Sequence, residues 1–308
     1  MASHAVLRGY LLVCGAVLFW GGSASLAKHL LAARQYDTVT LVQMRSTFSF
    51  LMFSLYFLLR DPSVFRFERQ DLWRLVLIGV VGLAATNFTY YYTFRASTIA
   101  TAILVQYTAP VLVMIYMVAV RKEESLSTQK GLSLLLALLG CFLAVSGGDV
   151  SAIQLRGWAI ASGIGSSLGY AYMLVGSKEL LKKYSVWTML TYAFGFATLF
   201  WLVVNPPWVI ARYHYGAEDW VIFWLFAMVS ILIPHTMFMA SLKLLEASTA
   251  GIASTLEPVV AIVVAYLALG EALNGVQIVG AVAVIAAVLL LQVKPYHRSR
   301  MLVRTDGE

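Results

Sequence analysis

The sequence predicts an all-α integral membrane protein whose ten transmembrane helices form two inverted five-helix repeats. Of its 308 residues, 60% are hydrophobic and only 12% are charged, which is far too apolar for a soluble domain. The apolar residues fall into ten runs close to the roughly 20 residues that a helix needs to cross a bilayer. The second half of the chain also repeats the first at a constant offset of 148 residues.

The ten runs follow one another with short connections, so successive helices are expected to cross the bilayer in opposite directions. The longest connection, residues 205–219, contains Pro206 and Pro207 and is expected to be a loop. The first run is too long for a cleaved signal peptide and is expected to remain as a spanning helix. The runs are residues 7–27, 39–59, 72–94, 97–120, 131–147, 157–176, 186–204, 220–242, 247–269 and 276–293.

The repeat is defined by matched residues in all five helices of each half. The matched pairs include Gly21 with Gly169, Tyr36 with Tyr184, Asp71 with Asp219, Pro110 with Pro258, and Glu123 with Glu271. We therefore expect a first repeat over residues 7–147, a second over 155–293, and a tail over 294–308. Because five helices is an odd number, the second repeat must enter the membrane from the opposite side, as in many secondary transporters.

A proline lies inside the fourth helix of each half. Pro110 and Pro258 each remove a backbone N–H and free the carbonyl four residues earlier, at Gln106 and Ser254. In lipid, such a break is tolerated where other groups satisfy the backbone, often beside a cavity. A duplicated broken helix is therefore a pointer to a transporter's binding site.

Loop charges predict the orientation in the membrane. With the N-terminus in the cytoplasm, sixteen basic residues lie on the cytoplasmic side and five on the other. This bias places both termini, including the tail 294–308, in the cytoplasm. The net charge of +7 is spread over these loops, so it indicates a lipid bilayer as the partner and not nucleic acid.

Glu257 is the only acidic residue well inside an apolar run, and it precedes Pro258. Ionisable residues at membrane depth usually face the bundle interior or a water-filled cavity. Glu257 is thus a candidate site for a substrate amine or for protons. The alternative is a glutamate satisfied by neighbouring backbone or by a structural partner.

Three further polar residues are candidates for substrate binding. His235 corresponds through the offset to Asn87, so both halves place a polar residue at one depth, and a histidine can titrate near neutral pH. Arg45 lies about two turns inside the second run and could pair with a substrate carboxylate. The alternatives are a hydrogen-bonded structural histidine and, for Arg45, a structural ion pair or a contact with backbone carbonyls.

Aromatic and small polar residues complete the candidate site. Trp20 lies deep in the first run, and Tyr91 lies late in the third, where it could instead belong to an interfacial aromatic belt. Gln106 and Ser254 lie on stripes of small and polar residues that suit either a cavity wall or close helix packing. We leave both alternatives open.

Glu123 and Glu271 each follow the broken helix of their half. In two inverted halves they would lie on opposite faces of the membrane. Together with Pro110 and Pro258 they are candidates for hinge or gate devices. The simpler alternative is that each carboxylate caps the helix that follows it.

These features together resemble the EamA branch of the drug/metabolite transporter superfamily. The resemblance rests on the two five-helix repeats, on Trp20-Gly21-Gly22, on Arg45, and on the paired proline and glutamate stretches. It covers nearly the whole chain, although position 193, the counterpart of Arg45, is alanine. The resemblance implies a monomer with a central cavity, exporting small metabolites such as amino acids by alternating access. For a short chain of this type without a targeting segment, we expect a bacterial inner membrane.

Other functions fit the sequence less well. The chain has no GxxxxGK[ST] loop and no HExxH zinc pair, so we expect no ATP, cofactor or metal and no enzymatic activity. An exchanger of phosphorylated sugars or nucleotide sugars remains the alternative, but Arg45 is the only deeply placed basic residue. A non-transporting scaffold would leave the paired broken helices unexplained.

Overall fold

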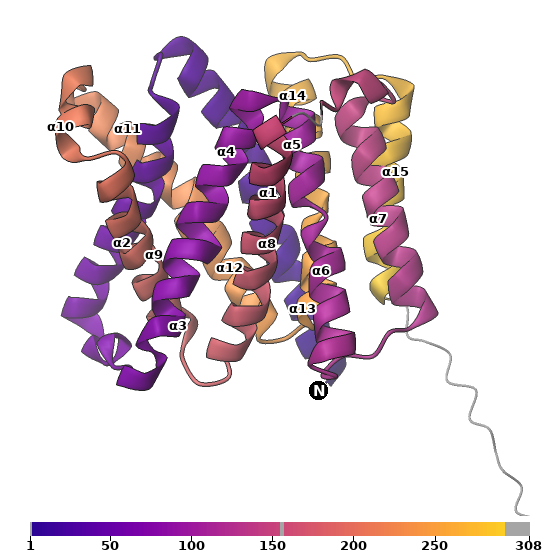
Figure 1. Ribbon diagram of the computed structural model, residues 1–308, viewed down its shortest axis with the longest axis horizontal. Coiled ribbons are helices and arrows are strands. Elements are labelled where there is room, and N and C mark those ends of the chain that lie inside the picture. Colours follow the sequence, from indigo (N-terminus) through magenta and orange to yellow (C-terminus); the bar gives the residue numbers. More distant parts are fainter. Residues whose placement is uncertain (1, 155–156, 293–308) are drawn as a thin grey trace, which may run out of the picture.

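The computed structural model describes residues 2–154 and 157–292, and the regular secondary structure in these ranges is entirely helical (Figure 1). The predicted tail 294–308 lies outside them. The α-helices are α1 (Ala2–Ala33), α2 (Thr38–Arg60), α3 (Leu72–Leu77), α4 (Thr86–Ala96), α5 (Ile99–Gln106), α6 (Ala109–Ile115), α7 (Thr128–Ser146), α8 (Gly157–Leu180), α9 (Val186–Val204), α10 (Pro207–Ile210), α11 (Ala217–Ala227), α12 (Ile233–Leu242), α13 (Ala247–Ser254), α14 (Leu256–Leu269) and α15 (Gly275–Gln292). Three π-helical segments lie within longer helices: η3 (Ile78–Ala85), η4 (Tyr116–Val120) and η7 (Met228–Leu232). Short 3₁₀ turns in the connections are η1 (Pro62–Phe65), η2 (Arg69–Asp71), η5 (Val150–Ala152) and η6 (Ala211–Tyr213).

Nine helical stretches among the described residues are long and apolar enough to cross a membrane. They correspond to nine of the ten predicted runs. The remaining run corresponds to α8, which has 24 residues but carries Ser162, Ser166, Ser167, Lys178 and Glu179. These polar residues lower its hydropathy, although α8 lies inside the bundle and packs against α4, α5, α6 and α12.

Two boundaries differ from those expected from the sequence. Helix α1 continues to Ala33, six residues beyond the first apolar run. The connection 205–219 is not a plain loop, because it contains α10 and η6, and α11 begins at Ala217. Pro207 is the first residue of α10, where a missing N–H costs no hydrogen bond.

The fourth membrane-spanning helix of each half is interrupted, at equivalent positions. The first is interrupted at Tyr107 and Thr108, between α5 and α6, and the second at Thr255, between α13 and α14. Tyr107 and Thr255 are 148 residues apart, the offset of the repeat. Pro110 and Pro258 lie in the first turn of the second piece, where a helix lacks N–H partners in any case.

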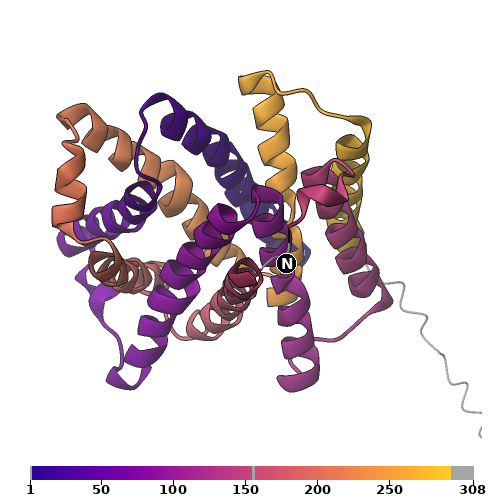
Figure 2. The ribbon, with the colours of Figure 1, turned by 45° about the horizontal axis from the view of Figure 1, so that its top comes forward.

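Helix packing is reciprocal between the two halves. Helix α1 packs against α12, α13 and α14, and α8, its counterpart in the second half, packs against α4, α5 and α6. The second helices of the halves, α2 and α9, pack against each other, as do the fifth helices, α7 and α15 (Figure 2). Such swapped contacts are what two halves related by a two-fold axis would make.

A pair of tyrosine–aspartate hydrogen bonds is also reciprocal between the two halves. The Tyr36 hydroxyl of the first half donates to Asp219 Oδ1 of the second half at 2.5 Å. The Tyr184 hydroxyl of the second half donates to Asp71 Oδ2 of the first at 2.7 Å. Tyr36 lies between α1 and α2 and Tyr184 between α8 and α9, at opposite ends of the bundle (Figure 1). Halves of opposite orientation would place them in this way.

Glycines allow α7 and α15 to approach closely. A Cβ atom on Gly280 would lie 2.3 Å from the Ala144 backbone nitrogen, and one on Gly140 would lie 2.8 Å from the Gly280 carbonyl oxygen. Small residues that let two backbones meet are typical of membrane helix pairs. This pair therefore forms a tightly joined side of the molecule, next to the broken helices.

Candidate functional site

Glu257 lies in the first turn of α14, directly after the interruption at Thr255. Its carboxylate is half-buried, and Oε2 accepts a hydrogen bond from the Tyr107 hydroxyl at 2.7 Å. Tyr107 belongs to the interruption between α5 and α6. The broken helices of the two halves therefore meet through a tyrosine from one and a carboxylate from the other.

The freed carbonyl of Ser254 is satisfied at the same place. The Tyr107 hydroxyl lies 3.3 Å from the Ser254 carbonyl oxygen, which lost its helical partner because residue 258 is proline. The Ser254 hydroxyl accepts from the Tyr170 hydroxyl of α8 at 3.0 Å and donates to the Gly251 carbonyl at 2.7 Å. We call Tyr107, Tyr170, Ser254 and Glu257 the Glu257 cluster.

Arg45 of α2 points towards η7, which directly precedes α12, the helix that carries His235. One of its guanidinium nitrogens, Nη2, donates to the Ser230 carbonyl in η7 at 2.9 Å. Its Nε is buried without a hydrogen-bond partner among the described residues. Neither Arg45 nor Glu257 takes part in a salt bridge within the described residues.

His235 of α12 is buried against the Trp20 indole of α1, with ring centroids 5.1 Å apart in an edge-on arrangement. Gly21, the next residue, brings α1 against α14, because a Cβ there would lie 2.9 Å from the Ala261 backbone nitrogen. Trp20, Arg45, His235 and Glu257 therefore come from four helices of both halves and gather in the interior of the bundle.

Asn87, Tyr91 and Gln106 are not hydrogen-bonded to the Glu257 cluster. Asn87 donates to the Leu83 carbonyl of its own helix at 2.7 Å. Tyr91 packs edge-on against Tyr90 and lines a small hollow of about 60 Å³ between α2 and α4. Gln106 is the last residue of α5 and makes no side-chain hydrogen bond within the described part of the chain.

Tyr107 and Tyr170 did not emerge from the sequence as candidates. Both lie in apolar surroundings where an aromatic residue is usually part of the core. The available signal was the repeat itself, because Tyr107 corresponds to Thr255, the residue at which the second helix is interrupted.

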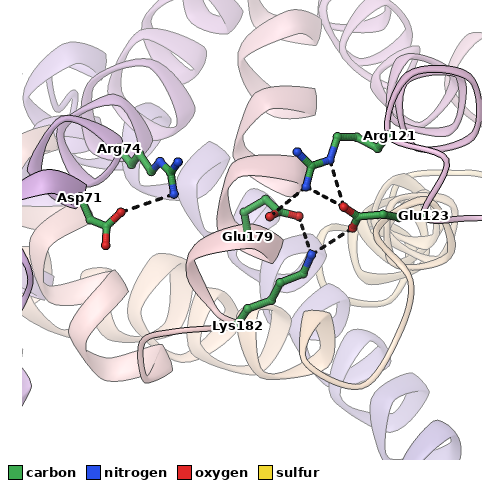
Figure 3. A network of polar contacts seen from close by, with 6 residues as sticks. All are labelled: Asp71, Arg74, Arg121, Glu123, Glu179 and Lys182. Atoms are coloured by element: carbon green, nitrogen blue, oxygen red, sulfur yellow. Dashed lines mark hydrogen bonds and ion pairs between the residues drawn. The ribbon is translucent and has the colours of Figure 1, made fainter.

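Glu123 belongs to an ionic network at one end of the bundle (Figure 3). Its carboxylate contacts Arg121 Nη2 at 2.6 Å and Lys182 Nζ at 3.0 Å, and Glu179 bridges the same two cations at 3.1 and 2.8 Å. Hydrogen bonds with Lys182 and then Arg121 hold the pKa of Glu123 below its usual range. Because residues 121–123 belong to the first half and 179–182 to the second, this network joins the halves. We call these four residues the first latch.

Glu271 joins the halves at the opposite end. It forms a salt bridge with Lys28 in α1, which we call the second latch. Neither glutamate caps the following helix. The Ser127 side chain accepts from the Lys130 N–H at the start of α7, and the Asn274 side chain accepts from the Gln277 N–H at the start of α15.

A buried carboxylate next to the first latch holds the start of α13. Glu124 accepts hydrogen bonds from the backbone N–H and the hydroxyl of Ser248, and its Oε2 lies 3.4 Å from Lys130 Nζ. Lys130 also forms a salt bridge with Glu246, the residue that precedes α13. Since α13 ends at Ser254, one eight-residue helix connects this end of the bundle to the Glu257 cluster.

Comparison with known proteins decides the family. The EamA-like transporter family model matches residues 7–146 and again residues 157–293. The chain belongs to the EamA-like transporter family. This EamA-like chain is therefore a multi-pass membrane protein, and its partners are a small-molecule substrate and the lipid bilayer. The family consists of transporters and not of enzymes.

Several curated proteins resemble this EamA-like chain over most of its length. An uncharacterized transporter of Archaeoglobus fulgidus is 31% identical over 258 residues, covering 82% of this chain and 86% of its own. The threonine/homoserine exporter RhtA of Escherichia coli K12 is 27% identical over 270 residues, covering 86% and 85%. The uncharacterized inner membrane transporter YicL of Salmonella typhimurium is 22% identical over 301 residues, covering 95% and 98%.

A solved crystal structure shows the same fold. It superposes on this EamA-like transporter with a TM-score of 0.76 at 17% sequence identity, covering 92% of this chain and 96% of the other.

Among the described residues no group of three or more histidines, cysteines and acidic residues is arranged to hold a metal ion.

Proposed function

We propose that the protein exports small polar metabolites that carry both an amine and a carboxylate, such as amino acids, by alternating access. The observation that carries this proposal is that Arg45 of α2 and Glu257 of α14, a basic and an acidic residue inside membrane-spanning helices, have no salt-bridge partners in the described chain. A zwitterion offers each of them a counter-charge at the same time. The name of RhtA, threonine/homoserine exporter, supports the same class of substrate.

The roles of the individual groups follow from their chemistry. Glu257 binds the substrate amine or, when no substrate is present, a proton. Arg45 binds the carboxylate through its free Nε and the edge of its guanidinium group. His235, held by Trp20, is a further polar group in the bundle interior.

Alternating access requires the two ends of the bundle to open in turn. The first latch and the second latch each join the two halves, and the halves are reciprocal in their packing. Opening one end therefore means releasing one latch while the other holds. The interruptions at Tyr107 and Thr255 are where each broken helix can bend, with Pro110 and Pro258 close behind.

The proposal is tested by counterflow with the purified protein in liposomes. The candidate solutes are a panel of amino acids and, for comparison, a sugar phosphate and a nucleotide sugar. Exchange of amino acids alone supports the proposal, whereas exchange of the phosphorylated compounds alone would replace it with the alternative function.

Two variants assign the activity to the site. Glu257→Gln keeps the size of the side chain but cannot ionise, so transport should be lost, and Glu257→Asp should retain part of it. Glu218→Gln is the matched control, because Glu218 is 70% exposed and pairs with Arg34 at the surface. Normal transport by Glu257→Gln would remove Glu257 from the mechanism.

A further inference from the structure

An apolar groove of about 470 Å³ lies between α2, α9 and η7, and none of its lining residues belongs to the Glu257 cluster. Its walls are formed by the second half of α2, by the start of α9 and by η7. The lining residues are Met52, Phe53, Tyr56, Phe57, Trp187, Met228 and Leu232. The volume is within the range of small-ligand sites.

Aromatic side chains shape this groove and open it towards the lipid. Trp187 packs against Phe53 and Phe57, with ring centroids 5.7 and 5.5 Å apart. Tyr56 is 58% exposed and Trp187 is 42% exposed. Tryptophan and tyrosine concentrate at the level of the lipid headgroups, so this end of the groove is expected to lie near a membrane surface.

Arg60 lies about one helical turn beyond the groove residue Phe57, at that end of the groove. Phe53, Phe57 and Arg60 follow one another at spacings of four and three residues, so they share one stripe of α2. Arg60 is exposed, as are Arg66 and Arg69 in the connection that follows. Within the described residues, none of the three forms a salt bridge or a side-chain hydrogen bond.

The length of the groove matches one leaflet of a bilayer. From Arg60 back to Met52, α2 rises by about 12 Å. Half of the hydrocarbon core measures roughly 15 Å. An acyl chain whose headgroup lies at Arg60 would therefore run along Tyr56, Phe57 and Trp187 towards Met228 and Leu232.

We infer that this groove binds one acyl chain of an anionic phospholipid, with the phosphate held by Arg60. The apolar walls alone would accept a chain from any lipid, and the unpaired arginine supplies the preference for a negative headgroup. The occupant would also support η7, whose Ser230 carbonyl accepts the hydrogen bond from Arg45. This inference does not depend on the transported substrate.

The test measures lipids retained by the purified full-length protein. The protein is placed in nanodiscs with equal amounts of phosphatidylglycerol and phosphatidylcholine and then released into a mild detergent. Bound lipids are counted by native mass spectrometry. The wild type should retain phosphatidylglycerol over phosphatidylcholine by about fivefold, the effect of one basic residue at a membrane surface.

Variants separate the two parts of the site. Arg60→Gln should abolish the preference while some lipid is still retained, and Met52→Trp, which fills the groove, should reduce retention of both lipids. Arg8→Gln is the matched control, because Arg8 is also exposed, and the N-terminal end of α1 lies at the same end of the bundle as the C-terminal end of α2 (Figure 1). It should behave as the wild type.

Three results would overturn the inference. They are a wild type without preference, an Arg60→Gln variant that retains it, and loss of the preference when millimolar inorganic phosphate is added. The last result would mean that the arginines bind a free anion and that no chain lies in the groove. Because Arg60 is exposed, its substitution leaves the fold intact, and the test holds even if Met52→Trp fails to fold.

Discussion

The Tyr107 hydroxyl is the one group that contacts both the Glu257 carboxylate and the freed Ser254 carbonyl. Tyr107→Phe should therefore lower the transport rate by about tenfold, because a buried hydrogen bond to a charged group is worth roughly 1.5–3 kcal/mol. It should also lower the thermal unfolding temperature in detergent. Counterflow and a thermal melt of the same preparation measure both effects.

Tyr170→Phe is the control for this prediction. It removes a hydroxyl of the same kind, but Ser254 Oγ keeps its hydrogen bond to the Gly251 carbonyl. Transport should stay within about twofold of the wild type, as expected for one neutral hydrogen bond with a remaining partner. Equal losses in the two variants would mean that Tyr107 acts only through packing.

The sequence predicted the charged members of the site better than its hydroxyl groups. Glu257, Arg45 and His235 stand out in the sequence because an ionisable residue at membrane depth is costly without a role. A tyrosine at the same depth carries no such cost. Its role depends on which carbonyl the distant Pro258 frees, and this is a tertiary relation.

The first latch should be insensitive to pH in the physiological range. The pKa of Glu123 is lowered, so its contribution to stability is present above the ordinary carboxyl value of about 4.3 and is lost as the pH falls through the lower folded value. The pKa of Lys182 is raised by its hydrogen bonds with Glu179 and Glu123, so its contribution is present below about 10.4 and is lost at higher pH. Any pH dependence of transport near neutrality must then arise elsewhere.

The Glu123→Gln variant tests whether the first latch is insensitive to pH near neutrality. The variant should unfold at a slightly lower temperature than the wild type, with a constant difference from pH 5.5 to pH 8 and a smaller one below about pH 4.3. Glu218→Gln, at an exposed pair on the opposite end, provides the comparison. A difference that changes between pH 6 and 7 would contradict the assignment of a lowered pKa.

The contact between α7 and α15 can be tested with one pair of glycines from the same helix. Gly280→Ala places a methyl group 2.3 Å from the Ala144 backbone, so it should destabilise the protein by about 1–3 kcal/mol. Gly275→Ala meets nothing within 4 Å and should be neutral or slightly stabilising. Thermal unfolding of both variants in the same detergent tests this prediction. Equal melting temperatures would rule out the close approach of α7 and α15 at Gly280.

At the level of elements, apolar run length predicted which segments are helical, and the prolines predicted which helices are broken. The π-helical segments η3, η4 and η7 could not be read in this way, because nothing in a local hydropathy pattern distinguishes them from α-helix. The short helix α10 was also missed, since Pro206 and Pro207 indicate a turn as readily as a helix start.

For the whole molecule, the offset of 148 residues carried more information than any single motif. It matched Tyr36 with Tyr184 and Asp71 with Asp219, and the structure joins each tyrosine to the aspartate of the other half. The sequence showed which residues are equivalent. It could not show that the pairs are exchanged between halves, because that depends on how the halves pack.

The orientation of the molecule in the membrane is the last prediction. The excess of basic residues on one side places the termini in the cytoplasm and the connection 205–219 outside. In a background with Cys14 and Cys141 replaced by alanine, Ala211→Cys should react with a membrane-impermeant maleimide in intact cells. Gln70→Cys, an exposed position in η2 directly before α3, should react only after the membrane is opened, because the start of α3 and α10 lie at opposite ends of the bundle (Figure 1). The reverse pattern would invert the topology and with it the assignment of the two latches, placing the first latch outside and the Lys28–Glu271 pair in the cytoplasm.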